Sequence, residues 1–133
     1  MNLLLLDSTK TQLVVALAVD GKITVTKTCD EQRQHDKNIN LLINELGIDK
    51  FDAVAVVTGP GSWTGIRVGL AVAKAFAYAQ QIPLIELRNQ IDVNEAMRKL
   101  NAGETVSPFA IKPFYNGEFI VNKTLKKEYH NAK

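Results

Sequence analysis

Hydrophobic residues recur along the chain in short runs that predict strands and in spaced sets that predict helices. Two apolar runs near the start predict strands over residues 2–6 and 11–19. The pair Asp20-Gly21 then predicts a hairpin turn into a third strand over 22–28, because this pair adopts the left-handed backbone that tight hairpins require. Apolar positions three and four residues apart predict a helix over residues 36–46.

The rest of the chain is predicted to alternate strands and helices. A short, almost wholly apolar run predicts a buried strand over residues 52–58, and a long helix follows and ends near Gln80. The further predicted elements are a strand over 82–87, a helix over 89–100, and two strands over 109–115 and 118–123 that flank Asn116-Gly117. This order predicts an α/β fold with a single ribonuclease-H-like domain, the N-lobe of actin-like ATPases, in which helices pack on a mixed five-stranded sheet.

The composition is that of one ordinary soluble domain. The chain has 133 residues, 16 Lys and Arg against 14 Asp and Glu, 46% hydrophobic residues and one cysteine. A single cysteine excludes disulfide and zinc-cluster scaffolds and predicts a reducing, cytoplasmic environment. The apolar stretch over residues 66–79 contains Lys74 and is shorter than the roughly 20 residues that a bilayer requires, so no membrane span is expected. The lysine-rich last eleven residues can attract RNA phosphates, although a solvated terminus is the favoured interpretation.

The most unusual string in the chain runs from Thr58 to Gly69 and predicts a strand-to-helix turn. Its glycines permit a close backbone approach, and Ser62 or Thr64 can cap the first free amides of the following helix. Such a helix start attracts anions, so an anion-binding turn is one interpretation, and a tight turn for packing is an equally weighted one. The string lacks both P-loop and dinucleotide-binding spacings. The candidate anion-binding residues are Gly59, Gly61, Ser62, Thr64 and Gly65.

The helix predicted after this turn carries small side chains on nearly every side. Its bulky residues, which are predicted to face the sheet, are Ile66, Val68, Val72 and Phe76. A second stripe is part apolar and part charged and consists of Arg67, Leu70 or Ala71, Lys74 and Tyr78. Because a chain of this length has little material left to cover that stripe, the stripe predicts a partner surface. A helix enclosed within its own domain is the alternative.

The sequence shows no complete catalytic or metal-binding constellation. Asp7 and Glu45 fit two acidic positions of a two-metal nuclease, but the fourth predicted strand ends without an acid. Asp7-Ser8-Thr9 is similar to the phosphate-binding hairpin of actin-like ATPases, which clamp nucleotide between two lobes. Cys29 and His35 lack a third, orienting group, and the two histidines do not have metal-ligand spacing. We therefore predict no catalytic residue, cofactor or metal ion.

Several strings in the first 92 residues are similar to those of a known family. They are the opening LLLLDST, the Asp20-Gly21 hairpin, the helix led by His35, and GPGSWTGIRVGLAVAKAFAYAQQIPLI from Gly59 to Ile85. This part of the chain resembles the TsaB family, also called YeaZ, whose pattern GPGSFTG-hydrophobic-R-hydrophobic-G it matches with Trp63 in place of Phe. The resemblance implies an N-lobe over residues 1–92. Residues 93–133 would be a short remnant of the family's C-terminal lobe, a helix plus a β-hairpin packed on the same domain.

The resemblance implies a non-catalytic subunit of the machinery that makes threonylcarbamoyladenosine at position 37 of tRNA. Such a subunit binds and activates the catalytic paralogue TsaD through N-lobe helices of both proteins, with the ATPase TsaE docking on the pair and tRNA contacted only through the complex. The implied contact residues are Asn38, Leu41, Glu45, Arg67, Leu70, Ala71, Lys74 and Tyr78. On this basis, Leu70→Arg is expected to leave the monomer folded and to abolish partner binding.

Two alternatives remain open at this point. One is a small hydrolase or nucleotide-binding enzyme of the same fold. The other is a homodimeric storage form built through the same helices, which would have a two-fold, self-complementary contact.

Overall fold

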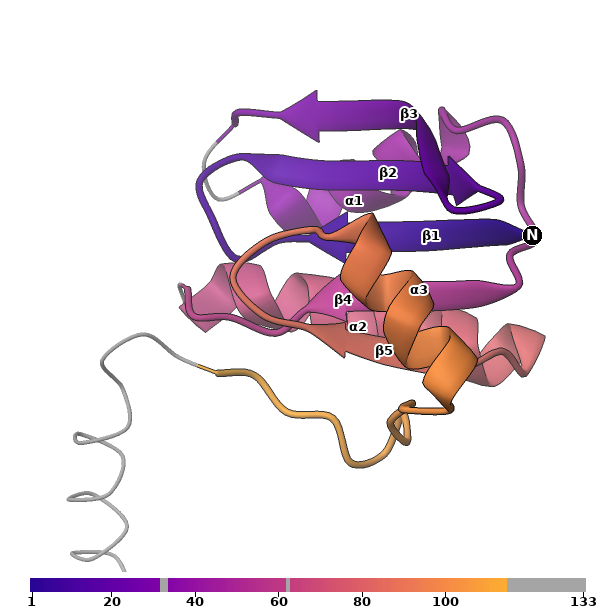
Figure 1. The fold of residues 1–133 in the computed structure, drawn as a ribbon. Helices are drawn as coiled ribbons and strands as arrows, with labels where there is room; N and C mark the ends of the chain where they lie inside the picture. Colours follow the sequence, from indigo (N-terminus) through magenta and orange to yellow (C-terminus); the bar gives the residue numbers. More distant parts are fainter. Residues whose placement is uncertain (32–33, 62, 115–133) are drawn as a thin grey trace, which may run out of the picture.

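The computed structural model describes residues 1–31, 34–61 and 63–114, which form a five-stranded sheet and three helices (Figure 1). In chain order the elements are β1 (Asn2–Asp7), β2 (Leu13–Val19), β3 (Lys22–Cys29), α1 (His35–Asn44), β4 (Ala53–Val57), α2 (Trp63–Gln80), β5 (Leu84–Leu87) and α3 (Val93–Ala102). The predicted succession of strands and helices is therefore confirmed through the third helix.

The sheet has β1 at its centre, in the order β3-β2-β1-β4-β5. The first three strands pair antiparallel, whereas β1 with β4 and β4 with β5 pair parallel. Asp20 and Gly21 form the predicted hairpin turn between β2 and β3, with φ angles of 52° and 84°. This mixed five-stranded sheet confirms the predicted α/β, ribonuclease-H-like fold class.

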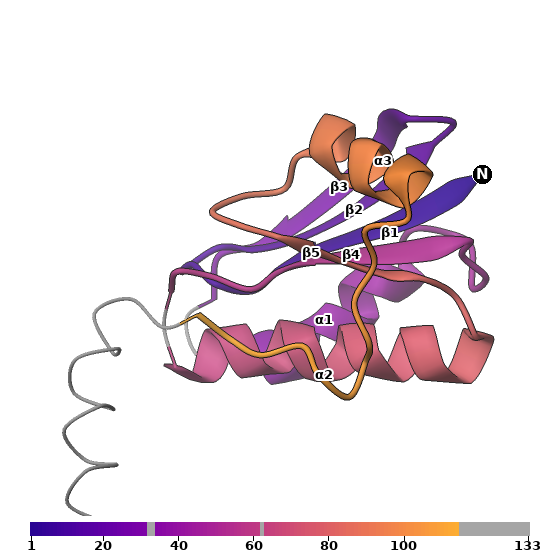
Figure 2. The same ribbon diagram turned by 60° about the horizontal axis from the view of Figure 1, so that its bottom comes forward.

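Helices cover both faces of the sheet, with α1 and α2 on one face and α3 on the other (Figure 2). Alternate residues of a strand point to opposite faces, so β4 and the four central residues of β1 are all apolar because both of their faces are covered. The core beneath α1 and α2 includes Leu4, Leu6, Val54 and Val56. The core beneath α3 includes Leu3, Leu5, Ala53, Ala55 and Val57.

The third helix begins at Val93 rather than at Asn89 as predicted. The Asp92 carboxylate accepts a hydrogen bond from the Glu95 amide at 3.1 Å and thereby caps the first turn. Asn89 itself has a φ of 72°, which a right-handed helix does not accommodate. α3 ends at Gly103, whose φ of 72° is the left-handed cap that glycine favours.

The predicted strand over residues 109–115 is wrong for the part that the structure describes, because residues 109–114 form no strand. The chain after α3 passes along β5 and α2 (Figure 2), and Val106 makes an isolated antiparallel bridge to Leu84. Ile111 then enters the core and is 5% exposed. In this segment Ile111 is therefore buried in the core, although the segment forms no ladder of strand hydrogen bonds.

Other predictions for the C-terminal part lie outside the described residues. They concern the strand over 118–123, the Asn116-Gly117 turn and the lysine-rich tail. Within the part of the chain that the structure describes, no helix has both the length and the apolarity needed to cross a bilayer.

Candidate functional site

The first helix buries one side and exposes the other. Its buried residues recur at helical spacing and are His35, Ile39, Leu42 and Ile43. On the outer side, Leu41 is 57% exposed and Glu45 is also exposed, whereas Asn38 is half-buried. Lys27 of β3 places its Nζ 3.8 Å from Glu45 Oε1, a distance typical of a surface ion pair. All three predicted contact residues of α1 thus reach the surface.

The second helix also has two distinct sides. The side toward the sheet carries Ile66, Leu70, Ala73 and Ala77, which recur at helical spacing and are at most 4% exposed. The side away from the sheet carries exposed or half-buried residues, which are Arg67, Ala71, Lys74, Ala75 and Tyr78. Of the four residues predicted to face the sheet, Ile66 is fully buried, whereas Val68, Val72 and Phe76 are half-buried and pack against the margin of the core.

Leu70 is a correction to the predicted contact residues. The sequence left Leu70 and Ala71 as alternatives for one stripe, and the structure places Leu70 in the core and Ala71 outside. Leu70 is therefore not an exposed contact residue. Contrary to the expectation from the sequence, we therefore predict that Leu70→Arg destabilises the folded monomer, because the substitution places an unpaired charge among buried apolar side chains.

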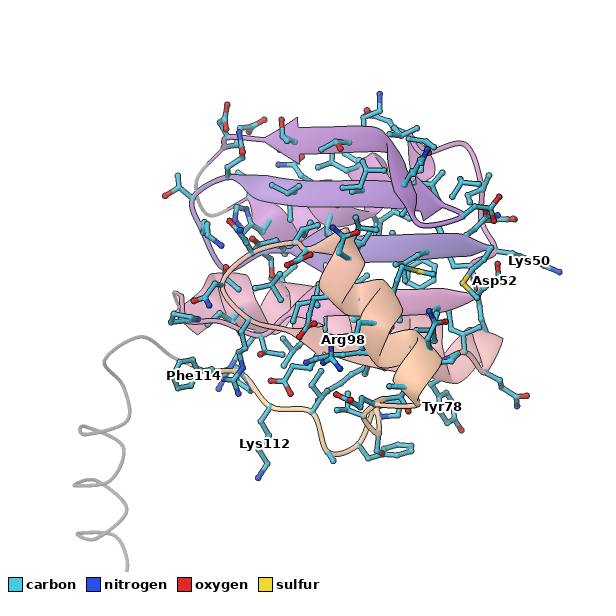
Figure 3. All side chains as sticks on the ribbon, in the orientation of Figure 1. Lys50, Asp52, Tyr78, Arg98, Lys112 and Phe114 are labelled. Carbon is cyan, nitrogen blue, oxygen red and sulfur yellow. The ribbon has the colours of Figure 1, made fainter. Side chains whose placement is uncertain are left out.

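Two exposed aromatic rings meet beside the outer side of α2. Tyr78 is 68% exposed and Phe109, from the segment after α3, is 83% exposed. Their ring centroids lie 6.0 Å apart at an interplanar angle of 76°, an edge-to-face contact. Figure 3 shows Tyr78 on the α2 side of the sheet, close to the segment that follows α3.

The glycine-rich turn before α2 has a clear packing role. Gly59 has a φ of 135°, and a Cβ at this position would overlap the carbonyl oxygen of Phe114. A Cβ at Gly61 would overlap the carbonyl oxygen of Thr9. The close backbone approach predicted for these glycines is therefore present. Ser62 lies outside the described residues, and anion binding by this turn stays a prediction.

A polar turn between β1 and β2 holds both helices in place. Ser8 Oγ accepts a hydrogen bond from the Gly69 amide of α2 at 2.8 Å, and a Cβ at Gly69 would overlap this hydroxyl. His35 Nε2, at the first residue of α1, donates to the carbonyl oxygen of Lys10 at 2.8 Å. Sequence reasoning missed both contacts. The available signal was the polar string Asp7-Ser8-Thr9 directly after an apolar strand.

The candidate catalytic side chains that the sequence brought into consideration each contact other groups in the structure. Among these residues, no group of three or more His, Cys, Asp or Glu could hold a metal ion. Asp7 is buried and bonded to Thr9 and Lys10, whereas Glu45 lies on the surface. Cys29 Sγ lies 4.0 Å from Glu31 Oε1, while His35 Nε2 is engaged by a backbone carbonyl.

An open pocket of about 470 Å³ lies on the opposite face, between β5 and α3. Its lining includes Arg98, which forms ion pairs with Glu95 at 2.7 Å and with Glu104 at 3.1 Å. Arg88, also in the lining, bonds Glu86 at 3.1 Å and stacks 4.6 Å from the ring centroid of Phe114. Because these cations already have counter-ions, the pocket is a weak candidate for binding anions or nucleic acid.

Comparisons with known proteins agree on one family. Residues 4–111 match the family model described as TsaD: tRNA N6-adenosine threonylcarbamoyltransferase. The chain is 35% identical over 112 residues to the tRNA threonylcarbamoyladenosine biosynthesis protein TsaB of Haemophilus influenzae, and 25% identical over 113 residues to the protein of that name in Escherichia coli. Each match covers 80% of this chain, but 47% and 48% of those proteins. The chain therefore spans about half the length of the curated relatives it matches.

A solved structure supports the same assignment. YeaZ from Pseudomonas aeruginosa superposes on this chain with a TM-score of 0.59 at 27% identity, covering 77% of this chain and 50% of that chain.

Proposed function

The chain belongs to the TsaD family and is TsaB- and YeaZ-like within it, and from this premise we propose that it is an accessory subunit in threonylcarbamoyladenosine biosynthesis on tRNA. Its proposed task is to bind and activate a TsaD partner, which supplies the catalytic residues that modify adenosine 37. The observation that carries the proposal is the exposed side of the two helices on one sheet face (Figure 2). We call it the α1–α2 surface and define it by Leu41, Glu45, Ala71, Lys74, Ala75 and Tyr78.

The α1–α2 surface has the chemistry of a helix-packing interface. Ala71 and Ala75 lie one turn apart and are exposed, so a helix of the partner can approach the α2 backbone closely. Leu41 and Tyr78 are the large side chains available to insert between partner residues. Glu45 is a charged group at the end of α1 and suits the polar rim of an interface.

The proposed interface does not require the part of the relatives that this chain does not match. Both helices lie between His35 and Gln80, within the matched region 4–111. Activation would follow from differential binding, since a surface that contacts the active conformation of TsaD better than the inactive one increases its population. In this proposal TsaE and tRNA are engaged through the pair, and the residues of this chain perform no chemistry.

The proposal is tested by Ala71→Arg. We expect this variant to keep the circular dichroism of the wild type, because Ala71 is exposed, and to lose affinity for TsaD from the same cell by about 10-fold or more, because a long charged side chain enters an apolar helix contact. Affinity is measured by titration calorimetry, and complex mass by size-exclusion chromatography with light scattering.

Ala102→Arg is the matched control, since it makes the same change at an exposed alanine of α3 on the opposite sheet face. Equal affinity of the two variants for TsaD would remove the α1–α2 surface from the interface. A wild-type chain that binds no TsaD but forms a dimer that Ala71→Arg dissociates would assign the surface to self-association instead, and the accessory role would be lost.

A further inference from the structure

The carboxyl end of β1 carries a polar cluster that the proposed function does not use. β1 lies between an antiparallel neighbour, β2, and a parallel neighbour, β4. The strand order reverses at β1, because the chain first runs from β1 through β2 to β3 and then places β4 on the other side of β1. In open α/β sheets, ligands bind outside the carboxyl ends of the strands at such a reversal. The last residue of β1 is Asp7, whose side chain is 6% exposed. A buried carboxylate at this position requires a compensating charge or several hydrogen bonds.

The compensating charge comes from Lys10. Its Nζ lies 2.9 Å from Asp7 Oδ2 and 3.2 Å from Thr9 Oγ1, and it also donates to the carbonyl oxygen of Asn89. Asp7 Oδ1, the other carboxylate oxygen, accepts the Thr9 amide at 2.9 Å and the Thr9 hydroxyl at 2.6 Å. Every hydrogen-bond donor of the ammonium thus has an oxygen partner, and the three oxygens belong to three different residues.

The third oxygen comes from a distant part of the chain and is held in position. Asn89 lies in the loop between β5 and α3, and its amide donates to the carbonyl oxygen of Gly59 at 2.9 Å. Its φ of 72° belongs to the left-handed region, which asparagine tolerates better than most residues. The Lys10 ammonium therefore joins the β1–β2 turn to the β5–α3 loop across the edge of the sheet.

A carboxylate, a hydroxyl and a backbone carbonyl are the ligand types that divalent cations such as Mg²⁺ and Ca²⁺ take in proteins. We propose that the Lys10 ammonium is the resident cation of this oxygen-lined site, and that it excludes divalent metal ions from the carboxyl end of β1. The Lys10 side chain is 51% exposed, so it reaches the oxygens from the solvent side and its removal leaves them accessible. With a single carboxylate, we expect the emptied site to bind a divalent ion weakly, with a Kd of about 1 mM or above.

The test compares Lys10→Met with the wild type in metal-free buffer and in the chlorides of Mg²⁺, Ca²⁺ and Mn²⁺, at ionic strength matched with NaCl. We expect Lys10→Met to lower Tm by about 3–6 °C, because the variant leaves Asp7 without its cation. At least one of the three ions should restore half or more of that loss, since binding to the folded state alone stabilises it. The wild type should not respond to any of them beyond the effect of NaCl.

Two controls make the result specific. Lys50→Met removes a lysine that extends into solvent at the opposite end of the sheet (Figure 3) and should behave like the wild type. Asp7→Asn combined with Lys10→Met should not respond to the ions, because the site loses its carboxylate. As a readout independent of stability, Mn²⁺ should broaden the amide NMR signals of Thr9 and Asn89 in Lys10→Met and leave those of the wild type sharp.

The proposal is overturned if none of the ions stabilises Lys10→Met, if the wild type responds to them equally, or if the double variant responds as strongly as Lys10→Met. Should Lys10→Met be unfolded in metal-free buffer, recovery of native circular dichroism on addition of an ion is measured instead. Failure of all three ions to restore it would likewise reject the site.

Discussion

The helices on the two faces of the sheet differ in which side chains they present to solvent and in how these side chains are paired. On α3, the exposed charges are paired within the chain, because Arg98 bonds both Glu95 and Glu104 and Lys99 donates to the Glu86 carbonyl at 2.8 Å. On α2, the outer side presents Ala71, Ala75 and Tyr78 beside Arg67 and Lys74, and the exposed ring of Phe109, from the segment after α3, contacts Tyr78. A surface that satisfies its own charges needs no partner, whereas an exposed side made of small and aromatic residues favours another helix.

The helices also differ in what holds their ends. α3 has an Asp92 cap and a Gly103 stop, both encoded next to the helix. α1 has no side-chain cap at Gln34, and its first turn is attached through His35 to the β1–β2 turn. α2 is attached to the same turn through Ser8. The face proposed to bind a partner therefore depends on contacts between distant segments, and the opposite face depends on local ones.

The largest expected effect distinguishes the inner from the outer side of α2. Leu70→Arg should lower the free energy of unfolding by about 4 kcal/mol or more, because a guanidinium replaces a side chain that is 4% exposed. The adjacent Ala71→Arg should change it by less than about 1 kcal/mol. Urea denaturation followed by circular dichroism measures both values. Equal stability of the two variants would contradict the burial that separates these neighbours.

An intermediate effect tests the contact between α2 and the β1–β2 turn. Ser8→Ala leaves the buried Gly69 amide without its acceptor and should cost about 1–3 kcal/mol. Gly69→Ala should also destabilise the protein, because its Cβ meets the Ser8 hydroxyl. In the double variant the clash is relieved, so the loss should be smaller than the sum of the single losses. Additive losses in denaturation experiments would show that the two residues do not act through each other.

The smallest effect concerns the ion pairs of α3. Hydrogen bonding to Arg98 holds the pKa of Glu95 and of Glu104 below the ordinary value of 4.5. A carboxyl group with a lowered pKa stabilises the folded state above its unfolded pKa, and this contribution is lost as the pH falls below about 4.5. Arg98→Gln should therefore lower Tm at pH 7 by less than about 3 °C, since the pairs lie at the surface.

The same variant should also make the decline of Tm between pH 5 and pH 3 shallower, as measured by thermal denaturation across this range. Lys112→Gln, at an exposed lysine after α3 (Figure 3), serves as the control for the loss of one positive charge. A steeper acid decline in Arg98→Gln than in the wild type would contradict the sign of the effect.

Much of the fold could be predicted because its signals are local. The β2–β3 hairpin depends on Asp20-Gly21, and the strands of the parallel part depend on continuous apolar runs, so each is readable within a few residues. The candidate partner residues of α1 came from the resemblance to the TsaB family, and the structure leaves Leu41 among them exposed. The apolar pattern after α3 led to the wrong prediction of a strand over residues 109–115, because Ile111 is buried although it does not lie in a strand.

The sequence by itself determined the order of strands and helices, the hairpin, the glycine-rich turn and the family to which the chain belongs. These depend on short-range backbone preferences and on recognisable strings. Tertiary structure decided which side of α2 is buried, because a helix rich in glycine and alanine has little contrast between its sides until a sheet packs against Leu70. It also decided the contact of Ser8 with Gly69, which is 61 positions away in the sequence, and that of Lys10 with Asn89, which is 79 positions away. No local pattern specifies either contact.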